Sequence, residues 1–194
     1  RIKQMRNRLK KTMIEVKDSG LVPEPMFATL ASGSTINDYV ASRKNDLPEL
    51  VDLAFAASER NADHLPDFIA KLEAKDPITR YWAAQGILIL GKDSAKAEPQ
   101  VAKLLSDDDS AIRVTAAQAL FNWGKKQQAI TALVAELDKS GNEYALANTI
   151  NALTQIKALD QIPDSWVKAN AKNKKAGKYV QRLASMLAKE RKKK

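Results

Sequence analysis

Hydrophobic residues recur every three or four positions along most of this chain, and Gly and Pro fall almost entirely between the stretches that show this spacing. Such spacing is typical of helices with one buried face, whereas the alternation of a half-buried strand is hard to find. The pattern therefore predicts an all-α chain.

The first twenty residues are predicted to form an amphipathic helix that ends near Gly20. Its apolar side chains share one stripe: Ile2, Met5, Leu9, Met13 and Val16. A stripe of this kind normally packs against another element. Pro23, Pro25 and a Ser/Gly stretch cannot continue the helix, so we expect an extended connection across the surface and then a short helix near Ser34 or Thr35.

A repeat with an offset of 33 residues dominates the rest of the chain. The segment DPITRYWAAQGILILG at 76–91 aligns with DSAIRVTAAQALFNWG at 109–124. The aligned pairs include Arg80 with Arg113 and Gln85 with Gln118. A further step of 33 reaches GNEYALANTINALTQIK, which keeps the apolar stripe but loses the Arg. The helices ahead of these segments repeat as well, so each unit is a pair of helices.

One helix pair cannot bury its own apolar faces, but three or more stacked pairs can share a continuous core. The signatures of ankyrin and tetratricopeptide repeats are absent. The segment LLSDDDSAIRVTAAQAL instead resembles a HEAT repeat, in which an Asp lies six residues ahead of an Arg. Here these residues are Asp107 and Arg113. Ala74 lies six residues before Arg80, so the preceding copy departs from an Asp–Arg ladder between repeats.

We therefore expect an α/α superhelix, a HEAT-like solenoid of about three full helix pairs plus flanking helices. Residues 1–44 are predicted to be an N-terminal helix and connector that form the tail of a preceding catalytic domain. Residues 45–194 are predicted to be the solenoid with a basic C-terminal capping helix. The chain opens with Arg1 and shows no secretory signal, so we expect a piece of a longer polypeptide. No apolar run approaches the roughly 18 residues of a membrane span.

Composition excludes several kinds of chemistry. The chain has no Cys and one His, so zinc fingers, iron–sulfur clusters and thiol nucleophiles lack their ligands or reactive groups. The net charge of +9 is uneven: residues 1–20 carry +5, residues 21–164 carry −6 and residues 165–194 carry +10. Because the excess lies at the ends and not over the scaffold, nucleic acid is a disfavoured partner.

The basic C-terminal stretch has two readings. As a capping helix, it would bury Val180, Leu183 and Leu187 and leave its lysines in solvent. As an anion-facing strip, it would use five cations: Lys172, Lys174, Lys175, Lys178 and Arg182. A sulfated polysaccharide, a nucleic acid or an anionic lipid surface would satisfy that strip equally well.

Other candidates also have a structural alternative. His64 is the only His of the chain, which favours a helix-cap position over a base or ligand. Asp107, Asp108 and Asp109 could suggest calcium, but capping of the next helix is the better reading. The aromatic residues Tyr81, Trp82, Trp123 and Trp166 could stack on sugars or bases, although packing between helices is more common at such positions.

Three segments in order carry a more specific resemblance: SGLVPEP at 19–25, then DLAFAASERNADHLPDFIAKL, then RYWAAQGILILG. Together they resemble the C-terminal region that follows the catalytic domain in a group of bacterial sulfatases. The resemblance implies a parent that hydrolyses sulfate esters with a formylglycine, made in a C/S-x-P-x-R motif, beside a calcium ion. Neither that motif nor the acidic calcium set occurs in this chain.

The resemblance therefore implies an accessory domain with no cofactor and no catalytic residue of its own, in an exported or periplasmic parent. Its expected partner is the preceding sulfatase domain of the same chain, which it would pack on or help to dimerise. A sulfated polysaccharide and a second copy of the chain are further candidate partners. The alternative is a HEAT-like scaffold that binds nucleic acid or another anionic polymer through its basic termini.

Overall fold

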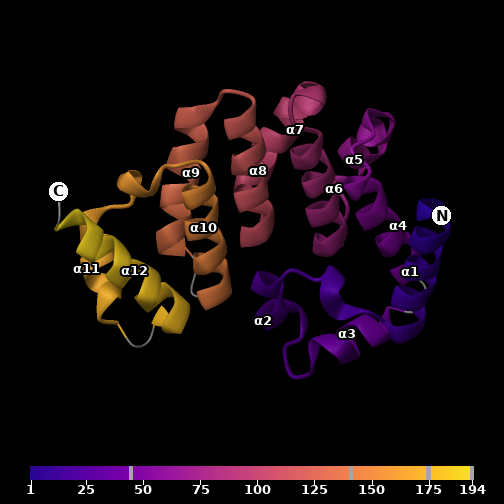
Figure 1. Ribbon diagram of the computed structural model, residues 1–194, viewed down its shortest axis with the longest axis horizontal. Helices are drawn as coiled ribbons and strands as arrows, with labels where there is room; N and C mark the ends of the chain where they lie inside the picture. The colour runs from indigo at the N-terminus through magenta and orange to yellow at the C-terminus, as the bar shows by residue number, and fades with distance from the viewer. Residues whose placement is uncertain (44–45, 140–141, 174–175, 193–194) are drawn as a thin grey trace.

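The computed structural model describes residues 1–43, 46–139, 142–173 and 176–192, and these residues form stacked helices without a strand (Figure 1). The α-helices are α1 Ile2–Val16, α2 Phe27–Leu30, α3 Ile36–Ser42, α4 Leu47–Ser58, α5 Leu65–Lys71, α6 Pro77–Leu90, α7 Glu98–Lys103, α8 Ser110–Asn122, α9 Lys126–Lys139, α10 Glu143–Gln155, α11 Asp164–Ala171 and α12 Lys178–Arg191. Short 3₁₀ turns connect them: η1 Ser19–Leu21, η2 Glu24–Met26, η3 Ala62–His64, η4 Gly91–Ala97, η5 Leu104–Ser106 and η6 Leu159–Gln161. The predicted all-α class is confirmed.

The three predicted helix pairs are α5 with α6, α7 with α8, and α9 with α10. Helices α4, α6, α8 and α10 pack in sequence to form one layer, and α5, α7 and α9 form a second layer against it (Figure 1). This two-layer stack of repeated hairpins is the predicted α/α superhelix with flanking helices.

The second helix of each pair begins at an equivalent polar residue. The side chains of Asp76, Asp109 and Asn142 each accept a hydrogen bond from a backbone N–H in the first turn of α6, α8 or α10. These residues satisfy donors that a helix start would otherwise leave without a partner. The 33-residue offset thus repeats the helix starts as well as the apolar positions.

The core is a seam between the two layers. Its largest fully buried members include Phe68, Ile78, Ile87, Ile112, Leu120, Leu133, Ile150 and Leu153. The alanine pairs Ala83–Ala84 and Ala116–Ala117 are also buried, which lets neighbouring helices approach closely.

The last pair, α11 and α12, packs on itself and places α12 against α10. Val180, Ala184 and Leu187 form its buried face. Arg191 in the last turn of α12 donates to Asp164 Oδ1 at 2.5 Å and to the carbonyls of Leu159 and Ile162 at 2.9 and 2.8 Å. These bonds hold the two ends of the pair together.

The connector after α1 differs from the expected extended crossing of the surface. Pro23 precedes η2, and Pro25 lies in its first turn, where a missing N–H costs little. Leu21, Val22 and Met26 are buried, and η2 packs against α8 and α10. The prediction was wrong because the prolines end α1 but tolerate tight turns, and the apolar residues between and beside them have a core to enter.

Candidate interaction surfaces

Three arginines connect successive helix pairs of the stack. Arg43 Nη1 lies 3.0 Å from Asp76 Oδ1, ahead of the first pair. Arg80 donates from Nε and Nη2 to Asp107 at 2.8 and 2.9 Å, between the first and second pairs. Arg113 donates likewise to Glu136 at 2.7 and 2.6 Å, between the second and third pairs. We call this series of Arg43, Arg80, Arg113 and their acids the arginine ladder.

The ladder differs from the pairing that the sequence motif suggests. The Asp107 carboxylate accepts from Arg80 of the preceding pair. Arg113 does not bond this carboxylate and instead donates from Nη1 to the backbone carbonyl of Asp107 at 2.6 Å. Arg80 needs no acid at Ala74, since its Nη1 donates to the Ala74 carbonyl at 2.9 Å. The charges of the ladder pair with one another between successive helix pairs, so the ladder links these pairs.

Two of the three aspartates that could have suggested calcium have structural roles. Asp109 caps α8 by accepting from the Ala111 N–H at 2.8 Å, and Asp107 accepts from Arg80 and from the Asp109 N–H. Burial raises the pKa of Asp109 above its ordinary value. In the described part of the chain, no group of three or more His, Asp or Glu residues is placed to hold a metal ion.

The tryptophans join elements by hydrogen bonds from the indole nitrogen to backbone carbonyls. Trp82 Nε1 donates to Leu21 at 2.8 Å, Trp123 to Gly91 at 2.7 Å and Trp166 to Leu137 at 3.3 Å. The ring of Tyr81 meets Trp82 edge-on at 5.6 Å. These contacts favour packing over stacking on a ligand.

His64 lies at the start of α5, but its side chain makes no capping bond. Its Nε2 is 3.0 Å from Glu59 Oε2, and its ring is tilted against Phe68 at 6.0 Å. The interaction with His64 and the nearby Arg6 lower the pKa of Glu59, while desolvation opposes them. The histidine therefore has a carboxylate partner that the sequence reading missed, five residues earlier in the chain.

Part of the expected anion-facing strip lies among the described residues: Lys172 follows α11, and Lys178 and Arg182 lie on α12. Lys172, Lys178 and Arg182 are exposed, and none of the three has a carboxylate within 4 Å among the residues that the structure describes. Lys174 and Lys175 lie outside the described residues. Tyr179 and Met186 are exposed beside the strip. The strip thus combines positive charge with apolar surface.

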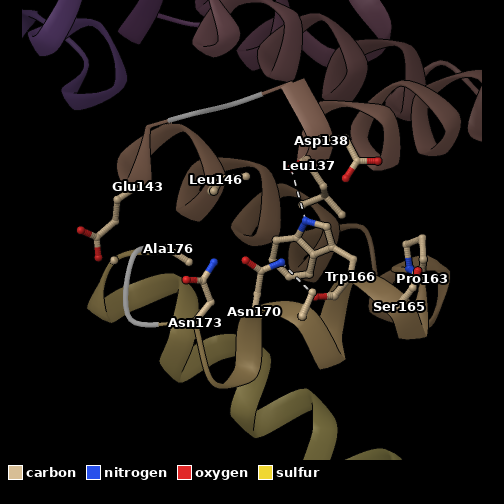
Figure 2. Close-up of a pocket in the computed structure, with 12 residues that line it drawn as sticks. Leu137, Asp138, Glu143, Leu146, Pro163, Ser165, Trp166, Asn170, Asn173 and Ala176 are labelled. Atoms are coloured by element: carbon tan, nitrogen blue, oxygen red, sulfur yellow. Dashed lines mark hydrogen bonds between the residues drawn. The ribbon is translucent and has the colours of Figure 1, made fainter.

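A hollow of about 680 Å³ separates the third pair from α11 and α12 (Figure 2). Trp166 forms one wall, and Asn170 Nδ2 donates to the Trp166 carbonyl at 2.9 Å. Glu143 Oε1 accepts from the Tyr179 N–H at 2.7 Å, in the first turn of α12. The bond of Glu143 to Tyr179 and the bond of Trp166 to Leu137 join the last helix pair to the third pair.

The face of α1 that carries the predicted stripe lies open. Ile2, Met5, Leu9 and Val16 are 77, 64, 52 and 65% exposed. The helix instead packs on α4 through the neighbouring face. Arg6 and Lys10 on that face pair with Glu59 and Asp52 at 3.0 and 2.6 Å. The stripe is amphipathic as predicted, but no described element covers its four outer members.

A groove of about 670 Å³ runs over the C-terminal halves of α6, α8 and α10. Its polar lining is almost entirely carboxamide: Gln85, Gln118, Asn122, Asn148, Asn151 and Gln155. Gln85, Gln118 and Asn151 occupy equivalent positions of the three pairs, each 33 residues from the last. We call this surface the amide groove.

A family model described as HEAT repeats matches residues 65–154, which span all three helix pairs. Those residues form a HEAT-like repeat domain. Comparison with curated proteins and comparison with solved structures both gave no match. None of the described helices combines the length and the apolar character needed to cross a membrane.

The sequence analysis did not predict two features of the HEAT-like repeat domain, the amide groove and the role of Glu136, although the groove left a signal. The aligned Gln85 and Gln118 mark the first two members of the amide groove, and one more step of 33 reaches Asn151. Glu136 left no such signal, because it lies on α9 and the offset from Asp107 points elsewhere. The resemblance to a sulfatase tail has no counterpart in the family match, which concerns the repeats alone.

Proposed function

We propose that this chain, whose residues 65–154 are HEAT-like repeats, is a non-catalytic accessory module that holds a neighbouring protein domain, and that this neighbour is a sulfatase domain of the same polypeptide. The observation that carries the proposal is the open apolar stripe of α1. Removing four large apolar side chains from water would contribute ~1.5–3 kcal/mol for each one fully buried.

The stripe is held in a fixed orientation. Arg6 donates to the Phe55 carbonyl at 3.2 Å and to Glu59 at 3.0 Å, and its guanidinium lies 5.3 Å from the centre of the Phe55 ring. Lys10 pairs with Asp52. A helix anchored by one polar face presents the other without a large ordering cost, which favours binding of a partner.

The spacing of the stripe favours a helical partner. Its four exposed members, with Thr12 between Leu9 and Val16, follow each other at steps of three and four, the spacing of a two-heptad packing seam. Arg1 and Arg8 flank the seam. The surface therefore fits an apolar helix with acidic neighbours, on the domain that it binds.

The sulfatase part of the proposal is supported by the sequence resemblance of three segments, at 19–25 and in α4 to α6, which occur in the same order as in the sulfatase tails. SGLVPEP forms η1, η2 and the turn between them, and its carbonyls are gripped by Trp82 of α6 and Asn142. The formylglycine and the calcium ion would belong to the partner domain, whose export would also place this module in the periplasm or outside the cell.

The decisive experiment for the sulfatase assignment is to read the coding sequence upstream of Arg1. A C/S-x-P-x-R motif in an open reading frame continuous with this chain is the expected result. A continuous frame that encodes a different domain, or none, would contradict the sulfatase assignment and leave the docking surface to be tested on its own.

The docking surface is tested by isothermal titration between this module and the separately produced preceding domain. We expect Leu9→Glu to weaken binding at least tenfold, because it puts a charge into the apolar seam. Asn7→Glu adds the same charge to another exposed face of α1 and is the matched control. Equal affinities of both variants would refute docking at the stripe, and sedimentation of the module alone shows whether a second copy occupies it.

A second function is favoured by the exposed strip on α12. Lys178 and Arg182 lie one turn apart beside Tyr179, an arrangement suited to a sulfated polysaccharide. Elution of the module from a heparin column should then shift to lower salt in the K178Q/R182Q variant. A parallel assay with duplex DNA should give weak binding that is lost by moderate salt. An unchanged heparin profile would remove this function.

A further inference from the structure

The amide groove lies on the same layer of helices that already holds a segment of this chain. The connector 19–26 packs against the N-terminal parts of these helices, while the groove covers their C-terminal halves. Two side chains grip the connector by its backbone: Trp82 Nε1 donates to the Leu21 carbonyl at 2.8 Å, and Asn142 Nδ2 donates to the Pro25 carbonyl at 3.0 Å. This layer thus binds polypeptide through side-chain donors and main-chain acceptors.

The groove repeats that chemistry with carboxamides in rows. A carboxamide carries two donor hydrogens and an acceptor oxygen, which match the carbonyl and N–H of a peptide bond. Gln118 Nε2 donates to Gln155 Oε1 at 2.6 Å, and Gln85 Nε2 donates to Thr115 Oγ1 at 3.1 Å. These bonds orient the two amides, and Gln85 also forms a hydrogen bond with the Tyr81 side chain. A carboxamide has two donor hydrogens and an oxygen with two lone pairs, so its capacity exceeds these bonds.

Between the amides the groove is apolar. Leu88, Ile89, Phe121 and Ile156 line it and are half-buried. They offer contact for alternate side chains of a bound chain. Arg60, after α4, is the only charged side chain among the groove's lining residues.

The dimensions fit an extended chain. Packed helices lie about 8–10 Å apart, and an extended chain advances about 3.3 Å per residue, so about three residues span one helix-to-helix step. Three helices therefore present their equivalent amides to a segment of about seven residues. A nucleic acid of that length would carry several phosphates, which one arginine cannot neutralise.

We propose that the amide groove binds an extended, largely uncharged segment of another polypeptide, with its peptide groups paired to the carboxamides and its apolar side chains on Leu88, Phe121 and Ile156. This site is separate from the α1 stripe and stands whether or not the proposed sulfatase partner exists. A single acidic residue of the segment would be matched by Arg60.

The probe is a displayed library of random linear twelve-residue peptides, selected on the whole chain. The best selected peptides are synthesised, and their affinities are measured by fluorescence anisotropy. We expect Gln118→Glu to weaken binding at least tenfold, since it keeps the shape but replaces the donors with a charge. Gln127→Glu, on the exposed face of α9, is the matched control and should bind as the wild type.

A second variant and a second readout guard against misfolding. Asn151→Asp should weaken the same peptides, and peptide should slow hydrogen exchange in the C-terminal halves of α8 and α10. The proposal is overturned if selection enriches no peptide. It is also overturned if Q118E and Q127E bind alike, if binding is lost only in the K178Q/R182Q variant, or if an RNA oligonucleotide competes for the groove at moderate salt.

Discussion

The guanidinium of Arg113 and the carboxylate of Glu136 form two parallel hydrogen bonds, 2.7 and 2.6 Å long, across the boundary between the second and third helix pairs. Glu136 is only 2% exposed, and Arg113 supplies a counter-charge to it through both carboxylate oxygens. The fork geometry of arginine suits such a site better than lysine would.

Breaking this pair from one side should destabilise the protein strongly. We expect Arg113→Met to lower the free energy of unfolding by about 3–5 kcal/mol, because it removes the two-bond contact of a cation with a buried carboxylate. The double variant R113M/E136M should recover most of that loss. Urea denaturation gives both values, with Glu15→Gln, in the exposed pair Lys11–Glu15, as a control expected within about 0.5 kcal/mol of wild type. A double variant as unstable as R113M would contradict this account.

The lowered pKa of Asp76 should make the free energy of unfolding depend on pH in the acid range. Burial of Asp76 opposes its ionisation, but hydrogen bonds from Thr79 and Arg43 outweigh burial and hold its pKa below the ordinary 3.8. A lowered pKa in the folded state adds stability above about pH 4, and that stability is lost as the pH falls through the folded pKa. Asp76→Asn keeps a cap acceptor but removes the charge. It should cost about 1.5–3 kcal/mol at pH 7 and progressively less below pH 4.

The control for this prediction is Asp46→Asn. Asp46 bonds the same guanidinium of Arg43 but is about half exposed. Its replacement should have a smaller effect on urea midpoints measured at pH 7 and pH 3. If D76N and wild type differ by the same amount at both pH values, the Asp76 charge is not the cause.

Gly86 and Phe68 are matched in size across α5 and α6. A Cβ at position 86 would lie 2.6 Å from the Phe68 ring, which is fully buried. The equivalent positions of the second pair carry Ala119 and the smaller Val101. Gly86→Ala should therefore lower the melting temperature, at a cost of about 1–3 kcal/mol. The F68V/G86A variant should be more stable than F68V alone. If G86A alone were more stable than wild type, the higher helix propensity of alanine would outweigh any clash, and the prediction would be wrong.

The hydrogen bond from Trp82 to the Leu21 carbonyl should help to hold the connector on the array. Trp82→Phe keeps the ring but removes the bond to the Leu21 carbonyl, so hydrogen exchange and proteolysis should quicken at residues 19–30. Trp123→Phe removes a similar bond, to the Gly91 carbonyl, within the array. It should leave the connector protected. Equal protection in both variants would mean that the buried Leu21, Val22 and Met26 hold the segment alone.

Local periodicity predicted most of the helices, because an apolar stripe and a polar cap are properties of neighbouring residues. The caps Asp76 and Asp109 fall one repeat apart and mark the starts of α6 and α8. Pairing between elements was harder to predict. Arg80 finds Asp107 at a separation of 27 residues, and Arg113 finds Glu136 at 23, so no single offset identifies the partners.

For the interaction surfaces too, local patterns were predictable from the sequence, whereas contacts between distant elements were not. The sequence indicated that α1 has an apolar stripe, but Arg6 and Lys10 decide which face meets α4, and their acids are more than 40 residues away. The amide groove requires three helices to be aligned before its members lie together. The anion-facing strip remains a prediction for its exposed members: Lys172 after α11, and Lys178 and Arg182 on α12.

The third copy of the ladder position holds Leu146 in place of an arginine. Each guanidinium reaches toward the following pair, so the stack has a direction and a final rung. Suppose that a duplicate of the second pair is inserted between the original and α9. The original Arg113 could then pair with the Asp107 of the duplicate, and the Arg113 of the duplicate could pair with Glu136. The same duplicate appended after α10 would meet only a leucine, so this array can be lengthened by engineering from within but not from its C-terminal end.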